Sequence, residues 1–137
     1  MDKKLKDQLS KIKLLICDID GVLTDGSFIK STSGEELRSF NALDGVGFVM
    51  LRLLDLNIKT AWITGRESLT TTQRAEELQI DDVYNGVIRK IDAYDELKEK
   101  YSISDNEICF IGDDIIDIPI LEKVGFAVTV PNAPKYI

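Results

Sequence analysis

The stretch Leu14–Gly21, with the sequence LLICDIDG, places a short apolar run directly before two aspartates and a glycine. A continuously apolar run of this length is typical of a strand whose two faces are both covered. A second such run, Ile108–Ile111, is followed by Gly112 and three further aspartates. Because clustered carboxylates repel one another, a divalent cation with oxygen ligands commonly compensates them. The two stretches therefore predict a metal site at one edge of a sheet.

The composition is typical of one folded domain in water. The chain has 137 residues, of which 44% are hydrophobic and 30% are charged, enough for a single core. The net charge of -7 argues against general nucleic-acid binding, but it allows a small anionic substrate beside local cations. No apolar run approaches the ~20 residues that span a bilayer, and the amino terminus lacks a secretory pattern. We therefore expect a cytoplasmic protein without membrane contact.

The chain contains no histidine, which excludes His-based catalytic triads and His-ligated zinc. Other side chains must then act as general acid and base, and the aspartates are the natural candidates. Cys17 and Cys109 both lie in apolar runs. We expect them to be buried, reduced thiols rather than a disulfide or a metal site.

Apolar runs alternate with helical patterns along the chain, which predicts an α/β fold with a central parallel sheet and right-handed crossovers. Residues 27–40 alternate weakly around Ser33-Gly34 and predict a small β-hairpin flap. No linker or cap domain is evident, so we expect one domain over residues 1–137. Strands are expected at 14–16, 59–63, 83–84, 108–111 and 126–130, and helices at 2–12, 44–56, 68–78, 90–101 and 115–123.

Two of these helices carry apolar residues at helical spacing. In the helix over 2–12, Leu5, Leu9 and Ile12 share one face, which we expect to dock on the core; a membrane-surface role is the alternative. The helix over 44–56 is expected to carry one apolar face, formed by Val46, Val49, Met50, Leu53 and Leu54.

The aspartates lie where ligands bind in open α/β sheets, at the carboxyl ends of the strands. Asp18 and Asp113 each end a strand, so their carboxylates converge if the two strands are neighbours. One carboxylate can attack phosphorus to form an acyl phosphate, and a second can protonate the leaving oxygen and then activate water. Asp18 and Asp20 are the candidates for this pair, although a turn at a strand end is the plainer interpretation of the motif taken alone.

Three further segments support phosphoryl chemistry. Thr64-Gly65 ends another strand and offers a hydroxyl and free backbone N–H groups to a phosphate. Lys90 begins a helix and could reach a phosphate over the same edge. Asp113-Asp114 with Asp117 exceeds what helix capping needs. Each has a plainer alternative when taken alone: the start of a helix, a solvated lysine and an N-cap.

In order and spacing, these segments resemble the four motifs of the haloacid dehalogenase superfamily. The first motif is Asp18–Asp25, the second is Thr64, the third is Lys90 and the fourth is Gly112–Asp117. The resemblance implies a Rossmann-like three-layer sandwich and assigns the roles of the side chains. It also extends over about residues 10–133, nearly the whole chain.

By this resemblance, Asp18 is the nucleophile and Asp20 is the general acid and base. Thr64 and Lys90 would hold the phosphoryl group. Magnesium would be held by Asp18, by the backbone carbonyl of Asp20 and by Asp113. Support for the metal, or a partner for Lys90, would come from Asp114 or Asp117.

Several stretches resemble, more narrowly, the phosphatases of 3-deoxy-D-manno-octulosonate 8-phosphate. This resemblance implies a magnesium-dependent phosphatase of lipopolysaccharide biosynthesis with an aspartyl-phosphate intermediate. It also implies a homotetramer in which a neighbouring subunit covers the open site. Members of this family usually continue past the last strand with a Gly-rich, Arg-bearing tail, whereas the sequence given ends at Ile137. The stretches are Leu23–Gly26, Phe40-Asn41 with Asp44-Gly45, Ile63–Ser68, Tyr84–Gly86 and Gly112–Asp114.

Substrate selection and assembly depend on residues beside these motifs. Arg66 follows the phosphate-binding turn and is the preferred partner for a substrate carboxylate, with Lys30 as the second candidate; a salt bridge from Arg66 to Glu67 or Asp44 is the plainer alternative. The hairpin could supply the interface between subunits or pack on its own domain. Its apolar candidates are Phe28, Ile29, Leu37 and Phe40.

Three other functions remain open from the sequence. The same chemistry could act on a nine-carbon, sialic-acid-type 9-phosphate, although Arg66 after Thr64-Gly65 favours the eight-carbon substrate. A non-catalytic oligomerisation module would not need the nucleophile, yet Asp18 is present. A phosphate- or sugar-sensing protein would not need the carboxyl group of Asp20.

Overall fold

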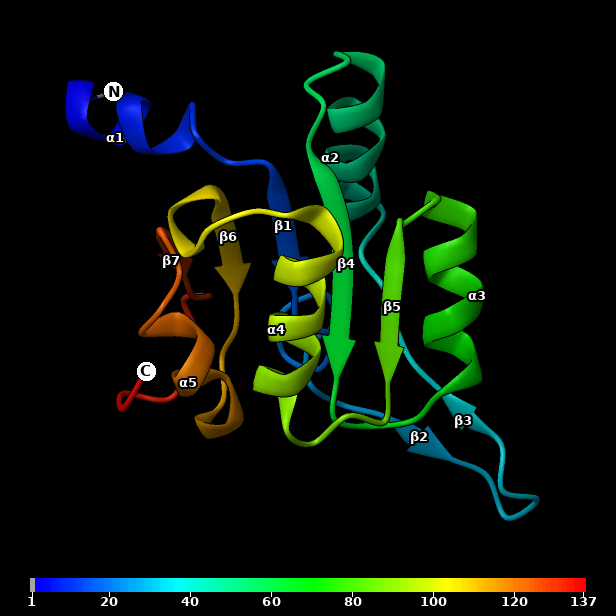
Figure 1. The fold of residues 1–137 in the computed structure, drawn as a ribbon. Helices are drawn as coiled ribbons and strands as arrows, with labels where there is room; N and C mark the ends of the chain where they lie inside the picture. Colours follow the sequence, from blue (N-terminus) through cyan, green and yellow to red (C-terminus); the bar gives the residue numbers. More distant parts are fainter. Residues whose placement is uncertain (1) are drawn as a thin grey trace.

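Five parallel strands form the central sheet of the computed structural model, which describes residues 2–137 (Figure 1). The strand order is β5-β4-β1-β6-β7, with β1 at the centre. This arrangement confirms the predicted parallel sheet, and it makes β1 a direct neighbour of both β4 and β6. The strands are β1 (Leu14–Cys17), β4 (Lys59–Thr64), β5 (Asp82–Asn85), β6 (Ile108–Ile111) and β7 (Phe126–Val128).

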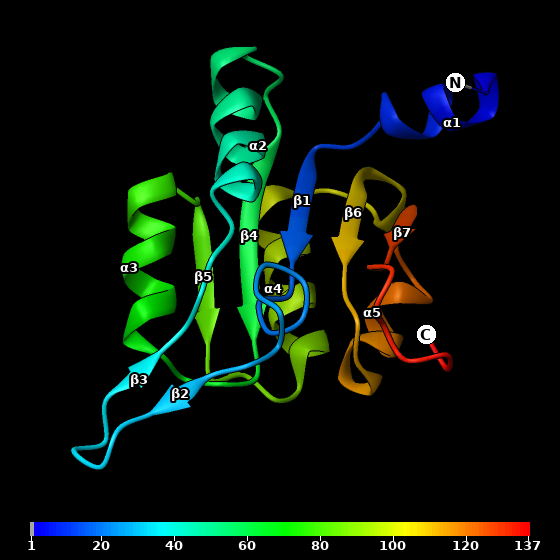
Figure 2. The same cartoon turned by 180° about the vertical axis from the view of Figure 1, so that it is seen from behind.

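Helices cover both faces of the sheet and give the three layers that the sequence predicts. Figures 1 and 2 show α2 and α3 on one face and α4 and α5 on the other. Two short 3-10 helices, η1 and η2, lie before β6 and after it. The helices are α2 (Ala42–Leu53), α3 (Leu69–Leu78), α4 (Lys90–Tyr101), α5 (Ile118–Leu121), η1 (Asp105–Glu107) and η2 (Ile115–Asp117).

Each face of the sheet has its own apolar core. On the α4 and α5 face, Tyr94 and Leu97 pack against strand residues such as Ile16 and Phe110. On the other face, fully buried Trp62 is central: the ring of Phe48 meets it edge-on at a centroid distance of 5.6 Å. Burial on both faces explains why the strands have continuously apolar sequences.

The predicted hairpin is present as β2 (Ile29–Lys30) paired antiparallel with β3 (Glu36–Leu37). Gly34 in its turn has a φ of +89°, a conformation that glycine adopts without steric cost. Figures 1 and 2 show the hairpin projecting away from the sheet at the carboxyl ends of the strands. It therefore lies at the edge of the sheet where a ligand is expected.

Docking of the first helix on the core is contradicted by the structure. The helix α1 (Lys3–Leu9) is shorter than predicted and contains no buried residue. It projects from the body of the protein at the amino end of β1 (Figure 1). The physical reason is that α1 ends at Leu9 and its apolar residues are few, so the segment offers little surface to bury.

The apolar face predicted for α2 is mostly exposed: Met50 is 43% exposed and Leu53 74% exposed. The helix packs on the sheet through Gly45 and Phe48 instead. A Cβ atom on Gly45 would lie 2.7 Å from Nη2 of Arg74 and 3.2 Å from Cδ2 of Leu78, so a larger residue there would displace these two side chains of α3. Helical spacing identifies an apolar stripe, but not which face the tertiary contacts use.

Cys17 and Cys109 are free, buried thiols, as predicted. Burial raises the pKa of Cys109 to about 11 and raises that of Cys17 still further. Both thiols therefore stay protonated at neutral pH. Among residues 2–137, no helix is long and apolar enough to cross a membrane.

Candidate active site

The pairing of β1 with β6 brings the two acidic motifs together. Cys17 lies opposite Ile111 in the sheet, and the backbone N–H of Asp18 donates to the carbonyl of Ile111 at 2.9 Å. Carboxylate oxygens of Asp18, Asp113 and Asp117 consequently lie within 4.8 Å of one another. The convergence expected from the sequence thus follows from strand order.

Asp117 fixes the loop that carries this cluster. Its Oδ2 accepts hydrogen bonds from the backbone N–H groups of Asp113 and Asp114, at 3.0 and 3.1 Å. Its Oδ1 lies 2.7 Å from Nζ of Lys90. Both oxygens of Asp117 are therefore engaged, which leaves Asp18 and Asp113 as the carboxylates free to bind a cation.

Lys90 lies at the start of α4, and its side chain is fully buried between two aspartates. Nζ lies 2.7 Å from Oδ1 of Asp18 and the same distance from Oδ1 of Asp117. From the sequence we expected a lysine that reaches over the edge of the sheet. In the structure Lys90 instead lies within the acidic cluster, where it also lines the cavity. One cation among three carboxylates leaves the cluster negative.

Burial raises the pKa of Asp18 to about 7, although the charge of Lys90 opposes this rise. Burial also raises the pKa of Asp113, whose Oδ1 is buried without a hydrogen-bond partner. A Cβ atom on Gly21 would lie 2.0 Å from Oδ2 of Asp113, so a glycine is needed beside this carboxylate. A cluster with unpartnered carboxylate oxygens and a surplus of negative charge suits a hard divalent cation such as Mg²⁺, which takes oxygen ligands.

Asp20 stands apart from this cluster and faces Thr64. The hydroxyl of Thr64 lies 3.5 Å from Oδ2 of Asp20, and it accepts a hydrogen bond from the backbone N–H of Arg66 at 3.2 Å. Just beyond Asp20, the hydroxyl of Thr24 accepts from the N–H groups of Gly21 and Gly26. The loop is therefore tied, and Asp20 is placed beside the turn proposed to hold phosphate.

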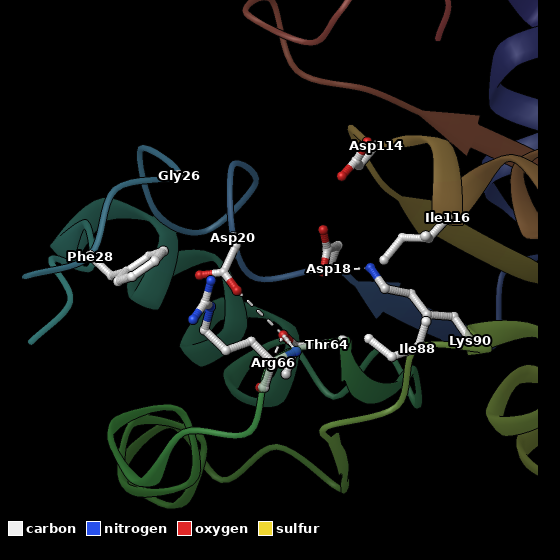
Figure 3. Close-up of a pocket in the computed structure, with 11 residues that line it drawn as sticks. Asp18, Asp20, Gly26, Phe28, Thr64, Arg66, Ile88, Lys90, Asp114 and Ile116 are labelled. Carbon is white, nitrogen blue, oxygen red and sulfur yellow. Dashed lines mark hydrogen bonds and ion pairs between the residues drawn. The ribbon is translucent and has the colours of Figure 1, made fainter. Parts of the chain in front are cut away.

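A cavity of about 390 Å³ opens between these groups (Figure 3). Asp18, Asp20, Thr64 and Lys90 all reach it, so the structure gathers these predicted site residues around one space. Asp114 is exposed at its rim, where its Oδ1 accepts from the N–H of Ile115 and so caps a short helix. The remaining lining residues are Gly26, Phe28, Gly65, Arg66, Ile88 and Ile116.

Arg66 lies over Phe28 of the hairpin, with Cζ 3.8 Å from the ring centroid (Figure 3). Its Nη1 is 3.7 Å from Oε2 of Glu36, a long ion pair. The plainer alternative from the sequence was a salt bridge from Arg66 to Glu67 or Asp44. The structure gives Glu36 instead, because the hairpin brings both Phe28 and Glu36 beside Arg66. Lys30, the second candidate, is an exposed residue of β2 in the hairpin.

Two residues that border the site, Glu36 and Arg38, could not be predicted from the sequence. Both belong to the weakly alternating hairpin, where charged residues ordinarily face water. In the structure the Arg38 side chain has no exposed surface, and its Nη1 lies 3.1 Å from Oδ1 of Asp20. Only the tertiary position of the hairpin reveals this contact.

Comparison with known proteins shows which sequences and structures the chain is similar to. A sequence profile of the haloacid dehalogenase-like hydrolases matches residues 66–137. The chain is 43% identical over 122 residues to the 3-deoxy-D-manno-octulosonate 8-phosphate phosphatase of Salmonella typhi. This alignment covers 89% of the chain and 64% of the Salmonella protein. The chain thus spans slightly less than two thirds of the length of this relative.

Solved structures show the same likeness. The 3-deoxy-D-manno-octulosonate 8-phosphate phosphatase of Yersinia pestis superposes with a TM-score of 0.93 at 37% identity, covering 99% of this chain and 72% of that one. The enzyme of Moraxella catarrhalis, in complex with a magnesium ion, a phosphate ion and 3-deoxy-D-manno-octulosonate (KDO), superposes with a TM-score of 0.92 at 33% identity. That alignment covers 98% of this chain and 76% of the other.

Proposed function

Because the chain belongs to the haloacid dehalogenase-like hydrolases, we propose that it hydrolyses KDO 8-phosphate to KDO and phosphate. Relatives of this chain in sequence and in fold are phosphatases of this substrate. The observation that carries the proposal is the gathering of Asp18, Asp20, Thr64 and Lys90 around one cavity. Residues 1–137 would form a single catalytic domain, with the hairpin over 27–40 as its flap.

In this proposal Asp18 is the nucleophile. One of its carboxylate oxygens forms a bond to phosphorus while the bond from phosphorus to the terminal sugar oxygen breaks, which leaves an aspartyl phosphate. Asp20 donates a proton to the departing oxygen. The deprotonated Asp20 then takes a proton from a water molecule as that water attacks phosphorus, which releases phosphate and restores both carboxyl groups.

Neighbouring groups hold the reacting atoms in place. The ammonium group of Lys90 binds Oδ1 of Asp18 at 2.7 Å, which leaves the other oxygen of Asp18 for phosphorus. The hydroxyl of Thr64 and the backbone N–H of Gly65 would bind phosphoryl oxygens. Fixed donors of this kind stabilise the charge that develops in the transition state.

Mg²⁺ is the proposed cofactor, and its ligands would be Asp18, Asp113 and the backbone carbonyl of Asp20. The unpartnered, buried Oδ1 of Asp113 and the negative charge of the cluster support this assignment. When bound, the ion would offset negative charge on the phosphoryl oxygens. Asp117 holds the loop and Lys90, whereas the exposed Asp114 would act only from the rim of the cavity.

Arg66 is the proposed partner of the substrate carboxylate. The test is a comparison of kcat/KM for KDO 8-phosphate and for a nine-carbon, sialic-acid-type 9-phosphate, with and without Mg²⁺. We expect the eight-carbon substrate to be preferred and Arg66→Met to raise its KM, with exposed Arg89→Met as the matched control. A preference for the nine-carbon compound would reassign the substrate. If neither compound released phosphate, the proposed phosphatase activity would be refuted.

Assembly into a tetramer is the remaining part of the proposal. Ile29 and Leu37 pair across the hairpin and are 67% and 61% exposed, which supports their use in an interface between subunits. Phe40 instead stacks on Trp62 of its own domain at a centroid distance of 6.4 Å. Light scattering should give a tetramer for the protein and a smaller species for the double variant Ile29→Ser, Leu37→Ser; a monomer before any substitution would rule the tetramer out.

A further inference from the structure

We propose that Arg38 of the hairpin is a positioning residue that holds the carboxyl group of Asp20 in its working orientation. The inference rests on the proposed function, because it assigns Asp20 the acid–base step. Arg38 does not line the cavity and reaches the reaction only through Asp20. The hairpin would then take part in catalysis from within its own subunit, in addition to any role in assembly.

The contact between the two side chains is buried and charged. The side chain of Arg38 has no exposed surface, and its Nη1 lies 3.1 Å from Oδ1 of Asp20. This oxygen is buried and accepts no hydrogen bond, so the guanidinium group is the charge that faces it. A buried carboxylate oxygen without such a partner would be costly, which makes the ion pair a restraint on the Asp20 side chain.

Arg38 is itself held from two further directions. Its Nε donates to Oε1 of Glu36 at 3.0 Å, and its Nη1 donates to the hydroxyl of Thr71 on α3 at 3.0 Å. Glu36 lies two positions before Arg38 on the extended chain, so their side chains share a face. The planar guanidinium group is thereby fixed in rotation, which the single ammonium of a lysine could not achieve as fully.

This restraint leaves the other oxygen of Asp20 pointing to the site. Oδ2 lies on the side of Thr64, at 3.5 Å from the hydroxyl. A free aspartate would sample several side-chain rotamers, and a general acid works only when it is within hydrogen-bond reach of the oxygen that leaves. Loss of Arg38 should therefore lower the rate of proton transfer, and it should change the affinity for the substrate much less.

The leaving group separates this role from a purely structural one. The alkoxide that leaves KDO 8-phosphate needs a proton, whereas p-nitrophenolate leaves without one. We expect Arg38→Met to lower kcat for the sugar phosphate at least about tenfold, with little change in KM. With p-nitrophenyl phosphate the same variant should give a burst of one p-nitrophenolate per subunit and then a slow steady state, since hydrolysis of the aspartyl phosphate still needs Asp20 as a base.

Two further variants complete the design. Arg38→Lys keeps the charge but loses the planar group, so it should restore only part of the activity. Arg52→Met removes an arginine that donates to the carbonyl of Leu78 on the far side of the domain, and it should behave as the unmodified protein. If Arg38→Met does not fold, Glu36→Gln removes the carboxylate that holds the guanidinium group and should give the same burst with smaller amplitude. Equal losses on both substrates, without a burst, would overturn the proposal.

A crystal structure of Arg38→Met tests the inference independently of activity. We expect the Asp20 carboxyl group to have turned away from Thr64; an unmoved Asp20 would overturn the role of Arg38. If the unmodified protein cleaves p-nitrophenyl phosphate but not KDO 8-phosphate, the substrate assignment fails while the burst still tests Arg38. If it cleaves neither, the proposed function fails and the position of Asp20 in the crystal decides on Arg38.

Discussion

Lys90 determines which oxygens of the acidic cluster remain free. It binds one oxygen of Asp18 and one of Asp117, and backbone N–H groups take the other oxygen of Asp117. The remaining oxygens belong to Asp18 and Asp113. A single buried cation thus separates the carboxylates that we propose to react or to bind metal from the one that supports the loop.

Removing this lysine should cost both stability and activity. Lys90→Met leaves two buried carboxylate oxygens without their partner, so we expect the free energy of unfolding to fall by about 3 kcal/mol near neutral pH. Phosphate release should fall about a hundredfold, because Asp18 and the phosphoryl group lose a fixed positive charge. Urea unfolding and steady-state kinetics measure the two effects.

The matched control lies on the same helix. Lys98 pairs with Asp105 at a partly exposed position, and Lys98→Met should cost about 1 kcal/mol or less. Similar losses for the two variants would contradict the special role of Lys90.

Glu107 makes part of the stability depend on pH. Its bond to Lys13, together with the N–H and hydroxyl groups of Ser104, lowers its pKa from 4.5 to about 2. Since the folded-state pKa is the lower one, the ionised side chain stabilises the fold above about pH 4.5, and this contribution disappears as the pH falls through about 2.

Glu107→Gln should therefore lower the urea midpoint near neutral pH, and the gap to the unmodified protein should close in acid. Exposed Glu99→Gln on α4 is the control and should leave the midpoint nearly unchanged throughout. A gap that stays constant with pH would show that the ionised carboxylate is not the cause.

At the scale of elements, Asn85 ties the end of β5 to the start of α3. Its side chain accepts from the N–H of Ser68 at 3.0 Å and donates to the carbonyl of Ser68 and the hydroxyl of Thr72, at 2.8 and 3.1 Å. These bonds close the loop that leads from Thr64 to α3. The turn that we propose to bind phosphate is therefore held at both of its ends.

Asn85→Ala removes all three bonds and should lower the free energy of unfolding by about 2 kcal/mol. It should also raise KM, because the turn after Thr64 loses one of its supports. Exposed Asn132→Ala is the matched control, with a change within about 0.5 kcal/mol. An unchanged KM beside a lowered stability would mean that the turn keeps its shape without Asn85.

The sequence predicts most elements well and their outer contacts poorly. The bounds of β6 and α4 agree with the predicted ranges, because a continuous apolar run and a clear helical period both act locally. Whether α1 docks on the core, and whether the apolar stripe of α2 is buried, depends on the tertiary contacts of each helix. The spacing of apolar residues in the sequence carries no information about these contacts. Arg38 shows the same limit within the site.

At the scale of the whole molecule, strand order accounts for the site. Because β4, β1 and β6 are neighbours, residues 64, 18 and 113 reach one edge of the sheet from distant parts of the chain. The motifs allow the prediction of these residues and of the sheet edge. Which oxygens are free, and which hairpin residue faces Asp20, required the packed structure.

Metal binding should be visible in the stability of the entire protein. We expect millimolar Mg²⁺ to raise the melting temperature, since a ligand that binds only the folded state stabilises it. Asp113→Asn should abolish this rise. The same variant should melt at a higher temperature than the unmodified protein when no metal is present, because it removes one of several mutually repelling charges.

Asp7→Asn on the exposed helix α1 is the control and should keep the Mg²⁺ response. A rise in melting temperature that survives Asp113→Asn would place the metal elsewhere.

The central claim is that the phosphoryl group passes through Asp18. The most direct measurement is mass spectrometry of the protein quenched in acid during turnover of p-nitrophenyl phosphate or KDO 8-phosphate. We predict one added phosphoryl group on the peptide that contains Asp18, only when Mg²⁺ is present, with accumulation in Asp20→Asn and none in Asp18→Asn. Phosphate release by the unmodified protein with no modified Asp18 in either protein would contradict the account.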